Sequence, residues 1–228
     1  MNLKERTCRA NLALASTGLV MGTFGNLSIV DRAAGVFAIK PSGVPYGELK
    51  PDKIVVVSLE TGQPADGKYK PSSDTATHLE LYRAFDCGAI VHTHSEFATL
   101  FAQTRTPIRC MGTTHADYFH GDIPVTRPMT RKEVESEYEA NTGKVIVEVF
   151  ANGHLSAEDI PAVLVANHAP FVWGRDAAKA IETAEILEFL ARLEWRGRVM
   201  APDAPPPDRF LIDKHFNRKH GKTAYYGQ

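Results

Sequence analysis

The sequence has few cysteines, and their arrangement argues against two kinds of site. Among 228 residues only Cys8, Cys87 and Cys110 are present, widely spaced and without a Cys-x-x-Cys pair. An odd number of isolated cysteines does not predict a disulfide framework, and nothing around any of the three indicates a nucleophile. We therefore expect three structural cysteines in a protein of the reducing cytoplasm.

Long apolar runs, strong net charge and nucleotide-binding motifs are also missing. No stretch approaches the ~18 apolar residues that a transmembrane helix needs. The N-terminal segment predicts an amphipathic helix and not a signal peptide. The formal net charge of −1 does not indicate a nucleic-acid or membrane partner. Neither a G-x-G-x-x-G pattern nor a P-loop is present, so no organic cofactor is expected.

What is present is an ordinary globular composition, with 43% hydrophobic and 23% charged residues. We expect one domain over residues 1–228. Hydrophobic periodicity predicts helices over residues 3–17, 74–86, 95–104, 130–143, 175–197 and 208–220. It predicts strands over residues 26–31, 35–40, 53–59, 88–94, 144–150 and 162–174. Because several strands follow one another through short turns, we expect a three-layer α/β/α fold with a mixed, mostly antiparallel central sheet.

The clearest functional signal is a His-x-His pair at the end of an apolar strand, in "GAIVHTHSEF". Successive side chains of a strand point to opposite faces, so His92 and His94 project from the same face, roughly 6–7 Å apart. Two imidazoles on one face can hold a divalent metal. The alternative is that both are ordinary polar residues at a strand end, and a catalytic metal site also requires a third ligand.

His168 is the best candidate for that third ligand, because it follows the apolar run "AVLVAN", where a sheet would open to a cleft. Three neutral imidazoles suit Zn²⁺, with Mn²⁺ or Co²⁺ as alternatives. The remaining histidines are interpreted as solvated or structural: His78, His115, His120, His154, His215 and His220.

Three small polar turns predict an anion site. Residues 40–43, "KPSG", and 70–74, "KPSSD", each combine a lysine, a proline and serine, and residues 25–28, "GNLS", form a third polar loop. Backbone N–H groups in such turns can bind a phosphate, and Ser72 and Ser73 also lie at the start of a predicted helix. Taken singly, each segment could be an ordinary turn or helix cap. Taken together, the three could surround one phosphate.

These motifs belong to a resemblance that extends from the first helix to the last residue. The segments that carry it are "TFGNLS", "IKPSGV", "KPSSDT", "IVHTHS", "GTTHADYF", "NHAPFVWG" and the terminal "AYYGQ". In these segments the chain resembles the L-ribulose-5-phosphate 4-epimerases of the class II aldolase/epimerase superfamily, to which L-fuculose-1-phosphate aldolases are related. The "THADYF" and "AYYGQ" blocks are much more specific than the His-x-His pair.

The resemblance implies roles for individual residues. It implies a metal site made by His92, His94 and His168, with Asp74 close to the metal. It implies that the substrate, mostly its phosphate, is bound by Gly25, Asn26, Lys40, Ser42, Gly43, Ser72 and Ser73. Asp117 and Tyr226 would be the catalytic acid/base pair, and Tyr226 would reach the site of a neighbouring subunit in a fourfold homotetramer. The resemblance also matches three further residues to positions near the site of these enzymes, namely Thr113, Glu139 and His215.

The implied reaction is the interconversion of L-ribulose 5-phosphate and D-xylulose 5-phosphate by cleavage and re-formation of the C3–C4 bond. Asp74 favours an epimerase, because the related aldolases carry glutamate after the Ser-Ser pair. The alternative is a class II aldolase acting on a phosphorylated ketose such as L-fuculose 1-phosphate. A metal-binding protein that has lost catalysis is disfavoured, because Asp117, Tyr226 and both serine turns are present.

Overall fold

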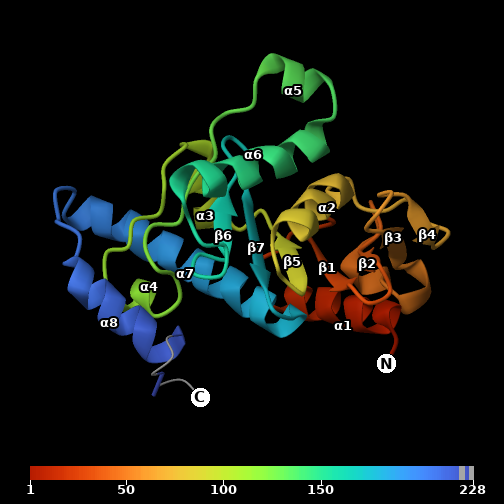
Figure 1. The fold of residues 1–228 in the computed structure, drawn as a ribbon, viewed down its shortest axis with the longest axis horizontal. Helices are drawn as coiled ribbons and strands as arrows, with labels where there is room; N and C mark the ends of the chain where they lie inside the picture. Colours follow the sequence, from red (N-terminus) through yellow and green to blue (C-terminus); the bar gives the residue numbers. More distant parts are fainter. Residues whose placement is uncertain (221–223, 226–228) are drawn as a thin grey trace.

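The helices of the protein are drawn in Figure 1, from a computed structural model that describes residues 1–220 and 224–225. The α-helices are α1 (Leu3–Ser16), α2 (Thr75–Ala84), α3 (Glu96–Gln103), α4 (Thr113–Ala116), α5 (Arg131–Glu135), α6 (Tyr138–Gly153), α7 (Ala177–Met200) and α8 (Arg209–His220). Two short 3-10 helices span Tyr46–Glu48 and Pro51–Lys53. In these described ranges, no helix combines the length and the apolar character needed to cross a membrane.

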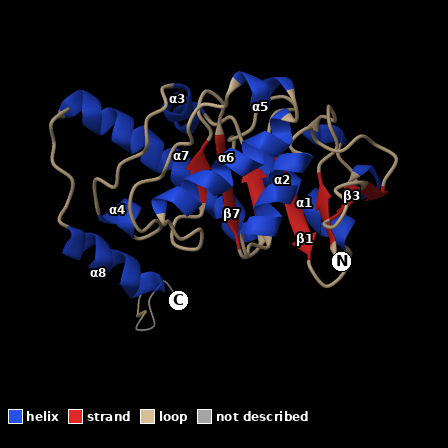
Figure 2. Ribbon diagram, turned by 45° about the horizontal axis from the view of Figure 1, so that its top comes forward, coloured by secondary structure: helices blue, strands red, loops and turns tan. Residues whose placement is uncertain are grey.

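The strands form one seven-stranded sheet, shown in red in Figure 2. They are β1 (Asn26–Asp31), β2 (Val36–Ile39), β3 (Val55–Ser58), β4 (Pro64–Asp66), β5 (Ala89–His92), β6 (Ala162–Leu164) and β7 (Pro170–Gly174). Their order across the sheet is β4-β3-β2-β1-β5-β7-β6, and each neighbouring pair is antiparallel. The predicted α/β fold with a mostly antiparallel sheet is confirmed.

The alternation of side chains along β7 shows which helices cover each face of the sheet. Trp173 contacts Phe150 of α6, with ring centroids 5.4 Å apart. Gly174 faces the opposite way and lies so close to α7 that an added Cβ would be 2.6 Å from the Ala180 nitrogen. Helices α2 and α6 pack together on the first face, while α1 and α7 pack on the second (Figure 1). The sheet therefore lies between two helical layers, as the strand pattern predicts.

One predicted strand is wrong. Residues 144–150 lie inside α6, and the helix predicted over 130–143 is divided between α5 and the first turns of α6. Val145, Ile146 and Phe150 are the buried apolar residues of this stretch, and their spacing is that of one helix face. The alternation in "KVIVEVF" is therefore a by-product of a helical pattern read over too short a window.

Close packing between α2 and α6 explains why the helix prevails. An added Cβ on Gly143 would lie only 2.5 Å from the Cβ of Glu80, so the two helices approach as closely as a glycine permits. This contact stabilises residues 138–153 as a helix, although three of the seven residues in "KVIVEVF" are valines, which intrinsically favour strands.

The predicted strand over 162–174 is two strands, β6 and β7, joined by a turn that contains Asn167 and His168. Asn167 has a left-handed φ of 63°, which asparagine tolerates better than most residues. Strand β7 then pairs with β5 so that Phe171 lies opposite His92. The tight turn thus places His168 beside the end of β5.

Candidate active site

The three predicted metal-binding histidines come together in the structure. Strand β5 ends at His92, His94 lies in the loop before α3, and His168 lies in the β6–β7 turn. Their possible ligand nitrogens all lie within 4.8 Å of one another. The Nε2 atoms of His92 and His94 are 3.1 Å apart. Antiparallel pairing of β5 with β7 thus converts distant positions in the sequence into one cluster.

His92 is held in one orientation by the strand next to it. Its Nδ1 lies 2.9 Å from the carbonyl oxygen of Pro170. Because a carbonyl can only accept a hydrogen bond, Nδ1 carries the proton and the Nε2 lone pair faces the other histidines. The ring of Phe171 stacks on the imidazole, with centroids 4.2 Å apart. The side chain of His92 is therefore oriented before any ligand binds.

Burial favours the uncharged form of the other two imidazoles. Burial, together with the neighbouring His92 and His94, lowers the pKa of His168 to about 4. Burial and then the proximity of His92 also lower the pKa of His94. The neutral imidazole is the form that binds a metal, so these side chains are ready to act as ligands at neutral pH.

This donor set fits a divalent metal. In a tetrahedral site with zinc–nitrogen distances of ~2.0–2.1 Å, two ligand nitrogens lie about 3.3–3.4 Å apart. The 3.1 Å between the Nε2 atoms of His92 and His94 is close to that spacing. Three protein nitrogens leave at least one coordination position for water or substrate, which is the arrangement of a catalytic site.

Asp74 lies in the same cleft, although the cluster found among the described residues contains only the histidines. Its Oδ2 accepts a hydrogen bond of 2.7 Å from Nδ2 of Asn26. Burial alone would raise the pKa of Asp74, but His92, His78 and the bond from Asn26 together lower it. The carboxylate is therefore ionised, and its negative charge complements a cation at the histidines.

A cleft of about 220 Å³ connects the histidines with the polar turns. Its walls include all the residues predicted to bind the metal or the substrate: Gly25, Asn26, Lys40, Ser42, Gly43, Ser72, Ser73, Asp74, His92, His94 and His168. Thr23, Phe24 and Pro41 complete the lining. The structure thus gathers segments that are up to 145 positions apart around one space, from Thr23 to His168.

Two of the turn amides are already engaged, which corrects part of the predicted anion site. The Ser42 amide donates to the carbonyl of Lys70 at 3.0 Å, and the Ser72 amide donates to the carbonyl of Lys40 at 3.1 Å. These bonds join the two Lys-Pro-Ser turns to each other instead of binding an anion. Within residues 1–220 and 224–225, the Ser73 amide makes no backbone hydrogen bond.

Asn26 lines the cleft and has one buried acceptor without a partner in the described part of the chain. Its Nδ2 donates to Asp74 and, at 3.2 Å, to the hydroxyl of Ser72. Its Oδ1 is buried and has no hydrogen-bond partner in the part of the chain that the structure describes. An unsatisfied buried polar atom costs about 1–3 kcal/mol, so the position of Asn26 is maintained by the two hydrogen bonds that its Nδ2 donates.

Asp117 does not line this cleft. It follows α4 and faces α8, which packs against α4 (Figure 1). Its carboxylate accepts hydrogen bonds from Arg218, at 2.7 and 3.0 Å, and from His215 Nδ1, at 3.0 Å. Burial alone would raise the pKa of Asp117, but the bonds from Arg218 and His215 lower it. Asp117 is thus an ionised carboxylate bound to the last helix.

The other predicted positions are less informative. Thr113 begins α4, and Glu139 lies in the first turn of α6, where its carbonyl accepts a hydrogen bond from the Thr77 hydroxyl. Neither residue lines the cleft. Tyr226 lies outside the described residues.

Two residues near these groups were not predicted from the sequence. Arg218 follows His215 by three positions on α8, and residues three apart share a helix face, so this spacing is a usable signal for a joint contact with Asp117. The ring of Phe24 lies 5.6 Å from that of His94, while 60% of the residue is exposed. Phe24 belongs to the "TFGNLS" segment, but that segment implied roles only for Gly25 and Asn26.

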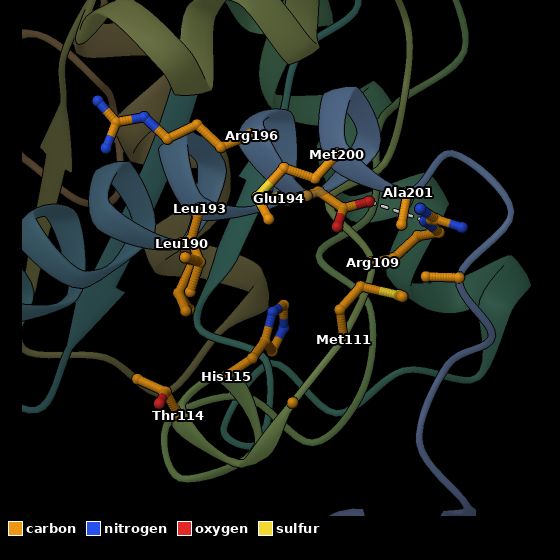
Figure 3. A pocket seen from close by; sticks show the side chains of 13 residues that line it. Arg109, Met111, Thr114, His115, Leu190, Leu193, Glu194, Arg196, Met200 and Ala201 are labelled. Carbon is orange, nitrogen blue, oxygen red and sulfur yellow. Dashed lines mark hydrogen bonds and ion pairs between the residues drawn. The ribbon is translucent and has the colours of Figure 1, made fainter.

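A second and larger cavity, of about 480 Å³, lies beside the C-terminal half of α7 (Figure 3). Its walls are largely apolar, with Leu190, Leu193 and Met200 among the lining residues. The Glu194 carboxylate forms ion pairs with Arg109, at 2.7 Å, and with Arg198 of α7, at 2.8 Å. Because its walls are largely apolar and its one carboxylate, Glu194, is already paired with arginine, this cavity is a poorer candidate for sugar-phosphate chemistry than the histidine cleft.

Comparison with known proteins places the chain in a family. Residues 5–195 match the family described as "Class II Aldolase and Adducin N-terminal domain". A structure of L-fuculose 1-phosphate aldolase is 28% identical, with a TM-score of 0.76 over 93% of this chain and 95% of the other. YgbL from Klebsiella pneumoniae, described as a putative aldolase/epimerase/decarboxylase, is 27% identical, with a TM-score of 0.73 over 93% and 96%. Because the family match spans most of the sequence, this chain belongs to the class II aldolase and adducin N-terminal domain family.

Proposed function

We propose that the protein is a metal-dependent isomerase that interconverts L-ribulose 5-phosphate and D-xylulose 5-phosphate. The observation that carries the proposal is a single cleft in which three metal-competent histidines face a buried lysine and two serine turns. One part of the cleft suits an oxygen-chelating metal and the other suits a phosphate. The aspartate at position 74 and the terminal "AYYGQ" favour the epimerase over an aldolase.

The chemistry explains why a metal site and a phosphate site are needed together. The carbon that is inverted, C4 of the pentulose phosphate, carries no acidic hydrogen. Removal and return of a proton at C4 therefore cannot be the route of inversion. Cleavage of C3–C4 followed by re-addition to the other face of the aldehyde inverts C4. A divalent metal, Zn²⁺ or else Mn²⁺ or Co²⁺, would supply Lewis-acid stabilisation of the negative charge that develops beside the carbonyl.

The residues of the cleft would bind and retain the two fragments. Lys40, Ser42 and Ser73 would hold the phosphate, so that the aldehyde fragment stays bound while it turns. Asn26 would hold the Asp74 carboxylate in the cleft through the hydrogen bond from its Nδ2. Retention of the fragment is what separates an epimerase from an aldolase, because an aldolase releases it.

Proton transfer at the C4 oxygen requires groups on two sides, because the aldehyde is attacked from opposite faces in the two directions. We assign these roles to Asp117 and Tyr226. Asp117 is ionised and can accept a proton, but it does not line the cleft of its own chain. We therefore propose a homotetramer in which the cleft of one subunit is completed by Asp117 and Tyr226 of the next.

The second candidate is a class II aldolase that cleaves a phosphorylated ketose such as L-fuculose 1-phosphate. The specific observation in its favour is the similarity to L-fuculose 1-phosphate aldolase over nearly the whole chain. The same cleft would serve both reactions, since each begins with cleavage of a carbon–carbon bond next to a carbonyl. The two candidates differ in whether the aldehyde leaves.

The decisive experiment measures epimerisation and aldehyde release in one reaction. We expect metal-loaded protein to convert L-ribulose 5-phosphate into D-xylulose 5-phosphate with little free glycolaldehyde phosphate, because the phosphate contacts retain the fragment. A coupled assay for xylulose 5-phosphate and a separate assay for free aldehyde give the two rates. Release of aldehyde faster than epimerisation would favour the aldolase, and L-fuculose 1-phosphate would then be tested as substrate.

Replacing Ser73 with alanine should weaken binding of the phosphorylated sugar much more than binding of unphosphorylated L-ribulose. Ser73 is exposed in the cleft, and its hydroxyl makes no hydrogen bond within the described residues. Losing a hydrogen bond to a charged phosphate costs about 1.5–3 kcal/mol, or roughly tenfold to a hundredfold in affinity. KM for both sugars measures the effect. Ser16→Ala, an exposed serine of α1, is the control, and equal losses on both sugars would contradict the assignment.

A further inference from the structure

Tyr46 lies behind the wall of the cleft and does not line it. The residue is only 8% exposed and begins the short 3-10 helix that follows the first Lys-Pro-Ser turn. Its hydroxyl donates to the carbonyl of Gly25 at 2.9 Å, with the carbonyl of Phe24 at 3.3 Å. Burial raises the pKa of Tyr46, so the phenol keeps the proton that this bond requires.

The segment that Tyr46 holds is the turn at residues 23–25, which leads directly into the cleft. Gly25 has a left-handed φ of 77°, and a Cβ there would lie 2.7 Å from the Val20 side chain and 2.9 Å from the carbonyl of His92. The turn is therefore packed tightly against the end of β5. Asn26, the next residue, pairs with His92 in the sheet. A displacement of the turn would therefore move Asn26 together with the part of the cleft wall that residues 23–25 form.

Tyr46 also contacts the one lysine that lines the cleft in the described part of the chain. The Lys40 ammonium lies 4.8 Å from the centroid of the Tyr46 ring and 3.3 Å from the carbonyl oxygen of Thr23. Lys40 is 2% exposed. No carboxylate among the described residues pairs with it, and burial is the cause that lowers its pKa. A buried cation without a counter-ion, stabilised by an aromatic face, is a site that favours a bound anion.

We infer that Tyr46 is a positioning residue for the phosphate of the substrate. Its ring supports the Lys40 ammonium and its hydroxyl fixes the 23–25 turn, so that both elements face the same anion. Tyr46 itself does not touch the substrate. The inference rests on the proposed function only in taking the anion to be the phosphate of the substrate.

The two contacts of Tyr46 can be removed separately. Tyr46→Phe keeps the ring over Lys40 and removes the hydroxyl, whereas Tyr46→Leu removes both. Tyr69→Phe is the matched control, because Tyr69 likewise lies under a lysine, with Lys53 Nζ 5.9 Å from its ring centroid, but does not line the cleft. All variants are full-length and loaded with the same metal, and metal content and thermal midpoint are measured for each.

For Tyr46→Phe we expect the Kd of inorganic phosphate, measured by calorimetry, to rise about tenfold, as the loss of one well-placed hydrogen bond predicts. KM for L-ribulose 5-phosphate should rise by a similar factor, with kcat within about twofold, since uniform binding is lost. Tyr46→Leu should weaken both further, by another factor of about three to ten, because the cation–π contact is also lost. Activity on unphosphorylated L-ribulose should fall much less than activity on the phosphorylated sugar in both variants.

The outcomes separate this inference from the proposed function. An active wild-type enzyme whose Tyr46→Phe variant keeps its phosphate Kd and KM overturns the role of Tyr46 alone. Equal losses on phosphorylated and unphosphorylated sugar also overturn it, because they indicate a general structural defect. Wild-type protein that binds phosphate, loses that binding in Tyr46→Phe and yet does not epimerise L-ribulose 5-phosphate overturns the proposed function and leaves Tyr46 as a positioning residue. Wild-type protein that binds no phosphate overturns both.

Discussion

Replacing His94 with asparagine should remove most of the bound divalent metal and abolish turnover in parallel. His94 supplies one of only three clustered nitrogens, and its Nε2 lies 3.1 Å from that of His92. Loss of a residue that merely orients a ligand already costs about 10–100-fold in metal affinity, so loss of a ligand itself should cost at least about 100-fold. Elemental analysis and activity measured on the same sample test the prediction.

A matched substitution separates metal loss from a general effect of losing a histidine. His154 is exposed and follows α6 with a left-handed φ of 51°, a conformation that asparagine tolerates. His154→Asn should therefore retain both metal and activity. Treatment of the wild-type protein with a chelator should abolish activity, and Zn²⁺, Mn²⁺ or Co²⁺ should restore it to different extents. Full activity in wild-type protein shown to contain no divalent metal would contradict the site.

The parts of the site that the sequence predicted are those fixed by local geometry. The His-x-His spacing places two imidazoles on one face of a strand, and β5 ends at the first of them. The polar turn "ANH" after an apolar run predicted that His168 would lie at the edge of a sheet, and the β6–β7 turn places it there. Both inferences depend only on strand periodicity and on a nearby turn, which a short window of sequence contains.

The parts that failed depend on contacts between distant segments. Residues 144–150 alternate like a strand, yet the packing of α6 on α2 through Gly143 makes them helical. The amides of Ser42 and Ser72 were expected to face an anion, but they bond the other Lys-Pro-Ser turn. Whether an amide in a turn is available depends on which segment lies opposite, and no local pattern specifies this.

Asp117 illustrates the same limit for a functional residue. The "THADYF" motif implied a catalytic role for Asp117. The side chains that contact its carboxylate, however, come from α8, about 100 positions later in the chain. Arg218 holds the Asp117 carboxylate on both oxygens, which ties this residue to the helix that precedes the C-terminal segment. Asp117 and the C-terminal helix thus form one unit that is separate from the cleft lining of the same chain.

If a neighbouring subunit completes the cleft, Asp117 should act on the substrate bound in the cleft of another subunit. We expect Asp117→Asn and Tyr226→Phe each to lower turnover by about 10²–10⁴-fold, the usual effect of a positioned acid or base. Metal content should stay unchanged in both variants, because neither residue belongs to the histidine cluster. A fully active Tyr226→Phe enzyme would remove Tyr226 from the mechanism.

Mixing two inactive variants tests the shared site directly. His94→Asn destroys the cleft of its own chain but leaves Asp117 intact, while Asp117→Asn does the reverse. In a closed ring where each cleft meets the Asp117 of the next subunit, random mixing at equal amounts pairs an intact cleft with an intact aspartate at roughly one quarter of the interfaces. Activity should therefore recover to roughly one quarter of the wild-type value as subunits exchange.

The control is a mixture that cannot complement. Asp117→Asn mixed with protein carrying both His94→Asn and Asp117→Asn should stay inactive, because no interface then holds an intact Asp117. The same design with Tyr226→Phe in place of Asp117→Asn tests the tail. Absence of recovery in tetramers shown by mass spectrometry to be mixed would mean that cleft and aspartate act within one chain. Asp117, which does not line the cleft of its own chain, would then have to move to reach the substrate.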